Sequence, residues 1–292
     1  MLAKIVLLLV VTLMACHQVS SYHFSREQVL KPFQEGKAFK VIAGLNNFNP
    51  SLVQKVAIAA DEGGATHVDI ACDAKLVAMV KALCKNTAVC VSSIKPKEFV
   101  KAVEAGADMI EIGNFDGFYE AGLRFSARDV LELTRETRSL LPSTPLSVTV
   151  PHTLPLPEQI LLAKELEHLS VDIIQTEGKM GVDPASMGVQ ELIEKAAPAL
   201  ASAYALSRAV KIPVMCSSGL SDVTAPMALS AGARGVGVGS VINRLKEEQQ
   251  MLLAVSAIAH AIGLAPTTHD DSDVSDISLH RSTPSTSSPE PR

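Results

Sequence analysis

The sequence predicts a (βα)8 barrel, an α/β TIM-barrel fold in which eight parallel strands alternate with eight helices. Eight short, β-rich runs recur along the 292 residues, and a stretch with helical periodicity follows each one. The runs are almost continuously apolar, as expected of parallel strands that are covered on both faces. An internal repeat supports the alternation. The length alone would also fit two domains, but one α/β barrel commonly takes about 250 residues.

The predicted strands share β-branched, apolar residues that end at a turn or at a helix-start signal. They are residues 40–48, 66–72, 88–94, 109–115, 146–152, 172–177, 213–219 and 235–240. Residues that favour a helix N-terminus follow several of them. These start signals are Asn49-Pro50, Pro96, Ser126, Pro157 and Asp222.

The internal repeat consists of segments 64–71, 106–113, 170–177 and 232–239, three of which begin Gly-Ala before a strand. Side chains of a strand alternate between its two faces, so equivalent positions of the repeat point the same way. Those positions hold Asp69, Glu111, Gln175 and Gly237, which we expect at the barrel mouth. A doubly wound open sheet is the alternative fold. Its glycine-rich turn after the first strand is absent, because residues 43–46 contain one glycine.

The two ends of the chain differ in composition from the middle. Residues 1–21 are predicted to be a signal-like leader, with Lys4 before an apolar run that is too short to span a bilayer. Residues 22–39 are predicted to form a lead-in helix or the rest of a transit segment. The barrel is expected over 40–265. Residues 266–292 are rich in Ser, Thr and Pro and acidic, so we expect a disordered tail.

Composition excludes some classes of function. Lys and Arg number 26 against 31 Asp and Glu, there is no Trp, and only 3 Tyr are present. Nucleic-acid binding is therefore not expected. Once the leader is cleaved, no membrane span is expected. The five cysteines have neither C-x-x-C nor zinc-site spacing, which predicts buried free thiols.

A site is predicted at the C-terminal rim of the strands, where barrels of this kind carry their chemistry. Polar side chains within apolar strands are costly unless they are satisfied. We expect Glu111, His152 and Asp69 to be catalytic, with Glu111 as a general base whose pKa burial would raise. The candidate ligand-binding residues are Asn46, Ser92, Asn114, Thr149, Gln175 and Glu177. Alternatively, the polar strand residues bond one another across the barrel and hold it closed.

The last two strands end in small residues whose backbone N–H groups could approach an anion. The predicted phosphate-binding residues are Ser217, Ser218, Gly219, Gly237, Gly239 and Ser240. They predict a phosphorylated small molecule as partner. FMN is a second candidate ligand, and an FMN-binding oxidoreductase is the corresponding alternative function. The alternative is that the glycines only allow the eighth strand to pack tightly against its neighbours.

Two other chemistries are less favoured. A divalent metal would find ligand types on four strands, but no local motif joins them. Those residues are Asp69, Glu111, His152 and Glu177. A Schiff-base aldolase needs a lysine that points into the barrel. No predicted strand interior carries one, and Lys95 and Lys179 fall in loops.

Several sequence runs together resemble one protein family. The runs are KVIAGLNNF at 40–48, EAGADMIEIGNFD at 104–116, LSVTVPHTLP at 146–155, QTEG at 175–178, IEKAAP at 193–198 and GVGSVINR at 237–244. Over residues 29–263 the chain is similar to the hypothetical chloroplast reading frame twenty-three family of plastids and cyanobacteria. The resemblance implies a TIM barrel of unassigned activity in a plastid.

A plastid setting would require the signal-like leader to direct the protein there through additional membranes, and the secretory pathway is the alternative destination. The clustered polar strand positions favour a metabolite-binding protein with acid–base chemistry. A non-enzymatic regulatory or assembly protein is the alternative, and a large exposed apolar patch would mark it.

Overall fold

The fold is given by a computed structural model that describes residues 23–119, 121–178 and 185–264. The leader predicted over 1–21 and the tail predicted over 266–292 lie outside the described residues. Within the described ranges, no helix is both long enough and apolar enough to cross a membrane.

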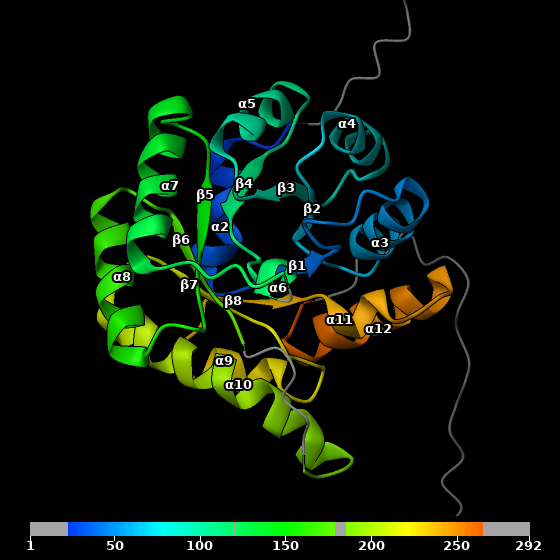
Figure 1. Cartoon of the computed structure of the whole chain (residues 1–292). Helices are drawn as coiled ribbons and strands as arrows, with labels where there is room; N and C mark the ends of the chain where they lie inside the picture. The colour runs from blue at the N-terminus through cyan, green and yellow to red at the C-terminus, as the bar shows by residue number, and fades with distance from the viewer. Residues whose placement is uncertain (1–22, 120, 179–184, 265–292) are drawn as a thin grey trace, which may run out of the picture.

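Eight parallel strands close into a barrel in sequence order, and helices surround them (Figure 1). The strands are β1 (Ala38–Ile42), β2 (His67–Ala71), β3 (Ala88–Ser93), β4 (Met109–Ile112), β5 (Leu146–Val150), β6 (Ile173–Thr176), β7 (Val214–Ser217) and β8 (Gly235–Val238). Every predicted strand overlaps one of them, so the (βα)8 class is confirmed. The barrel closes where Lys40 of β1 pairs with Gly237 of β8.

The helices of the outer ring are α3 (Pro50–Glu62), α4 (Ala74–Leu83), α5 (Pro96–Glu104), α7 (Ala127–Leu140), α8 (Leu156–His168), α9 (Val189–Ala209), α10 (Ala225–Ser230) and α12 (Glu248–Ala261). The predicted start signals at Asn49 and Ser126 act as N-caps, whose side chains accept backbone N–H groups of the first turn. Asp222 is different, because it lies in a turn and α10 begins three residues later.

Two short helices, α6 (Asp116–Tyr119) and α11 (Ser240–Asn243), follow β4 and β8 at the mouth of the barrel. All eight predicted strands extend past the observed strands at this end, and the first does so by the most. The apolar run after β1 continues to Phe48, but Gly44 has a φ of +103° and the chain turns there. An apolar run does not distinguish a strand from the buried loop that follows it.

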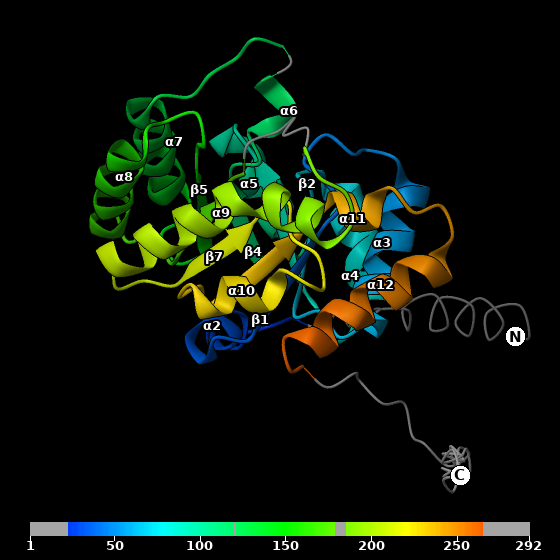
Figure 2. The ribbon, with the colours of Figure 1, turned by 90° about the horizontal axis from the view of Figure 1, so that it is seen from below.

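The opposite end of the barrel is closed by helix α2 (Arg26–Glu35), which lies within the segment 22–39 (Figure 2). A capping box at Ser25 and Gln28 begins the helix. Its buried Val29 and Phe33 pack with apolar residues from the floor of the barrel. These floor residues are Ala38, Ala88, Cys90, Met109, Ile173 and Met215. The lead-in helix is thus part of the hydrophobic core.

His67 is the first residue of β2 and therefore lies on this floor. Its Nε2 lies 3.0 Å from the carbonyl oxygen of Val29, and its ring centroid lies 4.8 Å from that of Phe33. Burial and the nearby Lys40 ammonium lower the pKa of His67 to about 3. A neutral, fully bonded imidazole at this depth joins α2 to the barrel.

Four cysteines fall in the described ranges, and all four are free thiols, as the spacing predicted. Burial raises the pKa of Cys72, Cys84 and Cys216 to about 12. Such thiols are protonated at neutral pH and are poor nucleophiles.

We predict that Phe33→Ala lowers the free energy of unfolding by about 3–5 kcal/mol, because it opens a cavity between α2 and the barrel floor. Urea denaturation measures the change. Leu161→Ala is the matched control, since Leu161 on α8 is 63% exposed, and it should alter stability by about 0.5 kcal/mol or less. Equal effects of the two substitutions would mean that α2 contributes no more than a surface helix.

Candidate functional site

A buried ion pair lies inside the barrel below its mouth. Lys40 projects from the middle of β1 and donates a hydrogen bond from Nζ to Oε2 of Glu111 on β4. Both side chains are completely buried. The prediction that no strand interior carries a lysine was wrong, because β1 begins at Ala38, two residues before the predicted start.

The charge of Lys40 decides what this lysine can do. Burial by itself lowers the pKa of an ammonium group, but the negative groups around Lys40, Glu111 foremost and Asp69 among them, outweigh burial and raise the pKa. Lys40 is therefore a protonated cation at neutral pH. A Schiff base requires the free amine, so the presence of this lysine does not favour that chemistry.

The second buried carboxyl, Asp69 on β2, accepts a hydrogen bond of 2.6 Å from the Ser92 hydroxyl. Burial is the largest influence on it and raises its pKa to about 7, while Lys40 acts in the opposite direction and Glu111 adds to the rise. Near neutral pH this group is thus poised between its two protonation states, unlike an ordinary aspartate.

Two amide side chains cover these charges on the side of the mouth. Asn114 donates from Nδ2 to Oδ2 of Asp69 at 3.1 Å and to Oε1 of Glu111 at 3.2 Å. Gln175 donates from Nε2 to the same Glu111 oxygen at 2.8 Å and to the Thr149 hydroxyl at 3.2 Å. Strand alternation therefore does bring Asp69, Glu111 and Gln175 together. The bonds among them also fit the alternative in which they hold the barrel closed.

A pocket of about 150 Å3 opens above this amide layer at the C-terminal ends of β5 to β8. Nine of the predicted ligand- and phosphate-binding residues line it: Asn114, Thr149, Gln175, Glu177, Ser217, Ser218, Gly219, Gly239 and Ser240. We call it the mouth pocket. Glu111 and Asp69 do not line it, because the amides lie between.

Backbone conformation and packing both explain the small residues at the end of β7 and within β8. Ser218 has a φ of +86°, a left-handed conformation that is strained for a serine. Gly219 has a φ of +71°, and a Cβ there would lie 2.3 Å from the carbonyl oxygen of Lys195 on α9. A Cβ on Gly237 would lie 2.8 Å from Oγ of Ser217. Packing therefore explains Gly237, which does not line the pocket.

The backbone around the mouth pocket leaves N–H groups unused. Within the described part of the chain, the N–H groups of Ser218, Gly219, Gly239 and Ser240 donate to no acceptor. Most backbone N–H groups in folded proteins are paired. Four unpaired donors from the ends of two neighbouring strands form a site that suits an anion.

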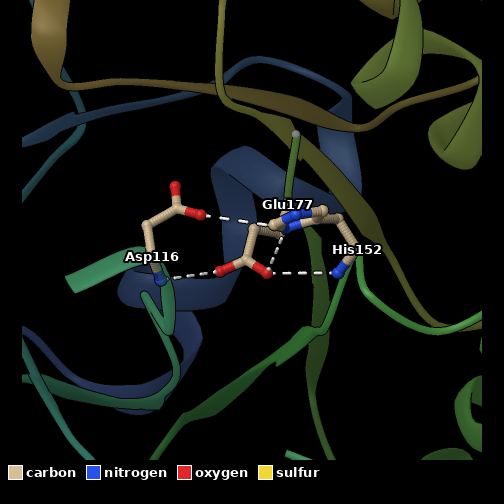
Figure 3. Close-up of side chains that lie close together, drawn as sticks. All are labelled: Asp116, His152 and Glu177. Atoms are coloured by element: carbon tan, nitrogen blue, oxygen red, sulfur yellow. Dashed lines mark hydrogen bonds and ion pairs between the residues drawn. The ribbon is translucent and has the colours of Figure 1, made fainter. Parts of the chain in front are cut away.

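Beside the mouth pocket, three side chains that follow β4, β5 and β6 meet (Figure 3). Asp116 and Glu177 line the pocket, whereas His152 does not. Nδ1 of His152 lies 3.0 Å from Oε2 of Glu177 and 3.8 Å from Oδ1 of Asp116. Asp116 was not predicted as a site residue. It is the first residue of α6, and chain spacing does not reveal that α6 brings it to His152 and Glu177. Its only sequence signal is its place at the same rim as the other candidates.

Glu177 joins the loops that carry this cluster. Its Oε1 accepts the N–H of Asp116 at 3.1 Å, and its Oε2 accepts the Tyr119 hydroxyl at 2.6 Å and the His152 N–H at 3.1 Å. The Tyr119 ring meets the His152 ring edge-on at 4.9 Å. One buried carboxylate thus positions α6 and the turn after β5.

Asp116 lies beside this carboxylate with an unusual protonation equilibrium. Burial, followed by the negative charge of Glu177, raises the pKa of Asp116 to about 7, and His152 opposes the shift. Burial and Glu177 also raise the pKa of Tyr119, which keeps its phenol protonated. The cluster therefore combines a carboxylate, an imidazole and a second carboxyl that exchanges its proton near pH 7.

The predicted site residues do not form one group. Asn46 is exposed and lines a separate pocket of about 440 Å3 above β2 and β3, together with Ser92. α6 lies against Asn46, since a Cβ on Gly117 would be 2.7 Å from its Nδ2. The four predicted metal ligands are divided as well. Asp69 and Glu111 surround Lys40, whereas His152 and Glu177 meet Asp116.

We predict that Lys40→Met lowers the free energy of unfolding by about 3–5 kcal/mol, because it leaves Glu111 buried without its counter-charge. Chemical denaturation of the purified protein measures this loss. Lys31→Met, which removes an exposed ion pair with Glu35, should cost about 1 kcal/mol or less. A loss that small for Lys40→Met would contradict the role given to the buried pair.

The contribution of Asp69 to the stability of the fold should depend on pH. A carboxyl whose pKa is higher in the folded state than its ordinary 3.8 stabilises the fold at low pH, and this contribution is lost as pH rises through about 7. Wild type should therefore lose stability relative to Asp69→Asn between pH 4.5 and 7.5. Unfolding in urea at several pH values measures the difference.

Asp129→Asn is the control for this pH series. The hydroxyl and backbone N–H of Ser126 lower the pKa of Asp129 from its ordinary 3.8, so this group is mostly ionised in both the folded and the unfolded protein between pH 4.5 and 7.5. The difference in stability between Asp129→Asn and wild type should therefore stay nearly flat over this range. A flat difference for Asp69→Asn as well would mean that Asp69 titrates as an ordinary carboxyl.

Comparison with solved structures finds barrels that act on phosphorylated compounds. (S)-3-O-geranylgeranylglyceryl phosphate synthase from Thermoplasma acidophilum, in complex with its substrate sn-glycerol-1-phosphate, has a TM-score of 0.55 at 13% identity, over 81% of this chain and 97% of that one. 3-Hexulose-6-phosphate synthase has a TM-score of 0.55 at 15% identity, over 77% and 99%. At such identity the likeness shows the fold alone.

Comparison of sequences shows the family. A family model described as "Protein of unknown function (DUF561)" matches residues 25–268. The uncharacterized protein ycf23 of Cyanophora paradoxa is 45% identical over 229 residues, which cover 78% of this chain and 94% of that protein. The ycf23 protein of Cyanidium caldarium is 40% identical over 234 residues, covering 80% and 94%. As the resemblance of its sequence runs predicted, the chain belongs to the ycf23 (DUF561) family.

Proposed function

We propose that this protein binds a phosphorylated small molecule in the mouth pocket and acts on it by acid–base chemistry. The phosphate group lies at the ends of β7 and β8, and the reacting part of the ligand faces Asp116, His152 and Glu177. The observation that carries the proposal is a set of four unpaired backbone N–H groups around one pocket, together with the strained backbone of Ser218. The four N–H groups belong to Ser218, Gly219, Gly239 and Ser240.

A phosphate fits this wall because backbone N–H groups can hold an anion without a basic side chain. A dianion with several acceptor oxygens would satisfy donors on both strand ends at once. The neighbouring barrels support the same class of ligand, since one is a complex with sn-glycerol-1-phosphate and another is a 3-hexulose-6-phosphate synthase. In this chain, the small residues at the ends of the last two strands were predicted to bind phosphate.

The acid–base groups of the proposal are Asp116 and Glu177, which line the pocket, and His152, which lies beside both carboxyl groups. Glu177 accepts a hydrogen bond from Nδ1 of His152, which orients the imidazole and leaves Nε2 free to accept a proton. Asp116 exchanges its own proton near neutral pH. Glu111 and Asp69, which sequence alone suggested as catalytic, act as positioning residues in this proposal because they are fully buried and bind Asn114 and Gln175.

Size favours a small metabolite over FMN. Pockets that bury drug-sized ligands have volumes of about 300–1,000 Å3. The mouth pocket, at about 150 Å3, is smaller. A regulatory or assembly protein remains the alternative, because the exposed apolar side chains of Met187, Val189 and Ile193 lie close in sequence at the start of α9. The unpaired N–H groups of the mouth pocket and the acidic cluster beside it favour a metabolite-binding protein.

The direct experiment is to purify the protein gently from its own source, denature it and identify the released molecules by absorbance and mass spectrometry. We expect a phosphorylated metabolite. A released flavin would instead support the FMN oxidoreductase, and an empty protein held in stable complexes would support the regulatory function.

A substitution at the pocket tests the phosphate site. Ser240 is exposed at the start of α11, so Ser240→Glu can place a carboxylate beside the bound anion without disturbing the core. Repulsion should weaken the binding of sn-glycerol 1-phosphate or inorganic phosphate at least tenfold, about 1.4 kcal/mol or more. Titration calorimetry measures the affinity. Ser240→Gln, of equal size and without charge, should bind nearly as wild type, and equal affinities for the two variants would contradict the proposal.

We propose a plastid as the setting, reached through the signal-like leader. The family resemblance supports the destination, and the composition of residues 1–21 supports the route. The first 40 residues fused to a fluorescent protein should direct it to the plastid. Fluorescence confined to the secretory pathway would contradict this destination.

A further inference from the structure

We propose that Asp116, His152 and Glu177 bind one divalent first-row transition-metal ion, such as Mn2+ or Zn2+, which holds the phosphorylated ligand in the mouth pocket. The inference rests on the proposed function, because the ligand supplies part of the coordination. The ligand would then be held at two points, by the anion site on β7 and β8 and by the cation.

The geometry suits one ion. One ligand atom from each of the three side chains lies within 4.8 Å of the other two, and His152 Nδ1 is 3.0 Å from Glu177 and 3.8 Å from Asp116 (Figure 3). The three residues follow β4, β5 and β6, so rigid neighbouring strands fix their separation. One imidazole nitrogen and two carboxylate oxygens form a borderline donor set, which favours Mn2+, Fe2+ or Zn2+ over Mg2+.

Further hydrogen bonds hold the donors in place. The Tyr119 hydroxyl and the backbone N–H groups of Asp116 and His152 all donate to the Glu177 carboxylate. Metal-binding carboxylates commonly have such partners, which orient the remaining lone pairs. The ion would replace the proton between His152 Nδ1 and Glu177 Oε2, and the other donors would stay. With the ion bound to the carboxyl of Asp116, Nε2 of His152 would be the remaining acid–base group of the proposed function.

Two buried oxygens without partners point independently to a ligand in this pocket. Oδ1 of Asp116 accepts no hydrogen bond within the described residues, and neither does Oε1 of Gln175. Gln175 is only 1% exposed, and its Nε2 is fixed by three acceptors, so its unpaired atom is the oxygen. Both residues line the mouth pocket. A bound cation satisfies the first oxygen, and a water or hydroxyl group that it coordinates suits the second.

Charge balance supports the same conclusion. The described residues that line the mouth pocket include two acids, Asp116 and Glu177, and no Lys or Arg. The Lys40 ammonium lies below the amide layer and is paired with Glu111. A phosphate placed in this pocket therefore meets like charge, which a divalent cation on the two carboxyl groups would neutralise.

The test uses the purified full chain, freed of metal with a chelator, and Mn2+ alone as the probe. Calorimetry and the electron paramagnetic resonance of free Mn2+ should give one ion per chain. Asp116→Asn and His152→Gln should each weaken the affinity at least tenfold. Asp129→Asn, which removes a surface carboxyl on α7, should leave it unchanged. Thermal unfolding of each variant checks that it is folded.

Affinities for Mn2+ that are equal in wild type and in folded Asp116→Asn and His152→Gln would overturn the cation site. Inorganic phosphate and sn-glycerol 1-phosphate are then titrated with and without Mn2+, and we expect at least tenfold tighter binding with the ion. Equal binding with and without Mn2+ would overturn the bridging role and leave the proposed function intact. Specific Mn2+ binding without any phosphate binding would support the cation site and contradict the proposed function.

Discussion

The Lys40–Glu111 ion pair is the interaction on which the upper half of the barrel depends. Two opposite charges with no solvent access are stable only if each remaining lone pair and proton finds a partner. Asn114 and Gln175 provide those partners, and this requirement fixes the orientation of both amides. The floor of the mouth pocket is therefore determined by charges that the pocket itself does not touch.

Glu177 has a similar organising effect one layer higher. Four donors from two segments, α6 after β4 and the turn after β5, converge on its carboxylate, so both segments are held relative to β6. The walls of the mouth pocket differ in character as a result. On one side, side-chain carboxyls and an imidazole are positioned by hydrogen bonds. On the other, small residues leave their backbone N–H groups available.

Hydrophobic runs were sufficient to predict the eight strands, because both faces of each strand are covered and its composition differs sharply from that of the helices. Period-two alternation was sufficient to place Asp69, Glu111 and Gln175 on one inner layer. What alternation cannot supply is where a strand begins, and an error of two residues at β1 hid Lys40. Asp116 was missed for another reason, since its position depends on a turn that no periodicity describes. Gly237 shows that a glycine in a strand can report packing as well as a ligand.

The closure of β1 against β8 has a consequence for how the chain is made. In this barrel the first strand obtains one of its two neighbours only from the last strand, and α2 packs on residues as distant as Met215. During synthesis, therefore, neither the ring nor its α2 cover can be completed until β8 has left the ribosome. Contacts of such long sequence separation form slowly. The ring of the nascent protein thus stays open through the synthesis of its first seven strands, and it becomes rigid only when β8 is available to pair with β1.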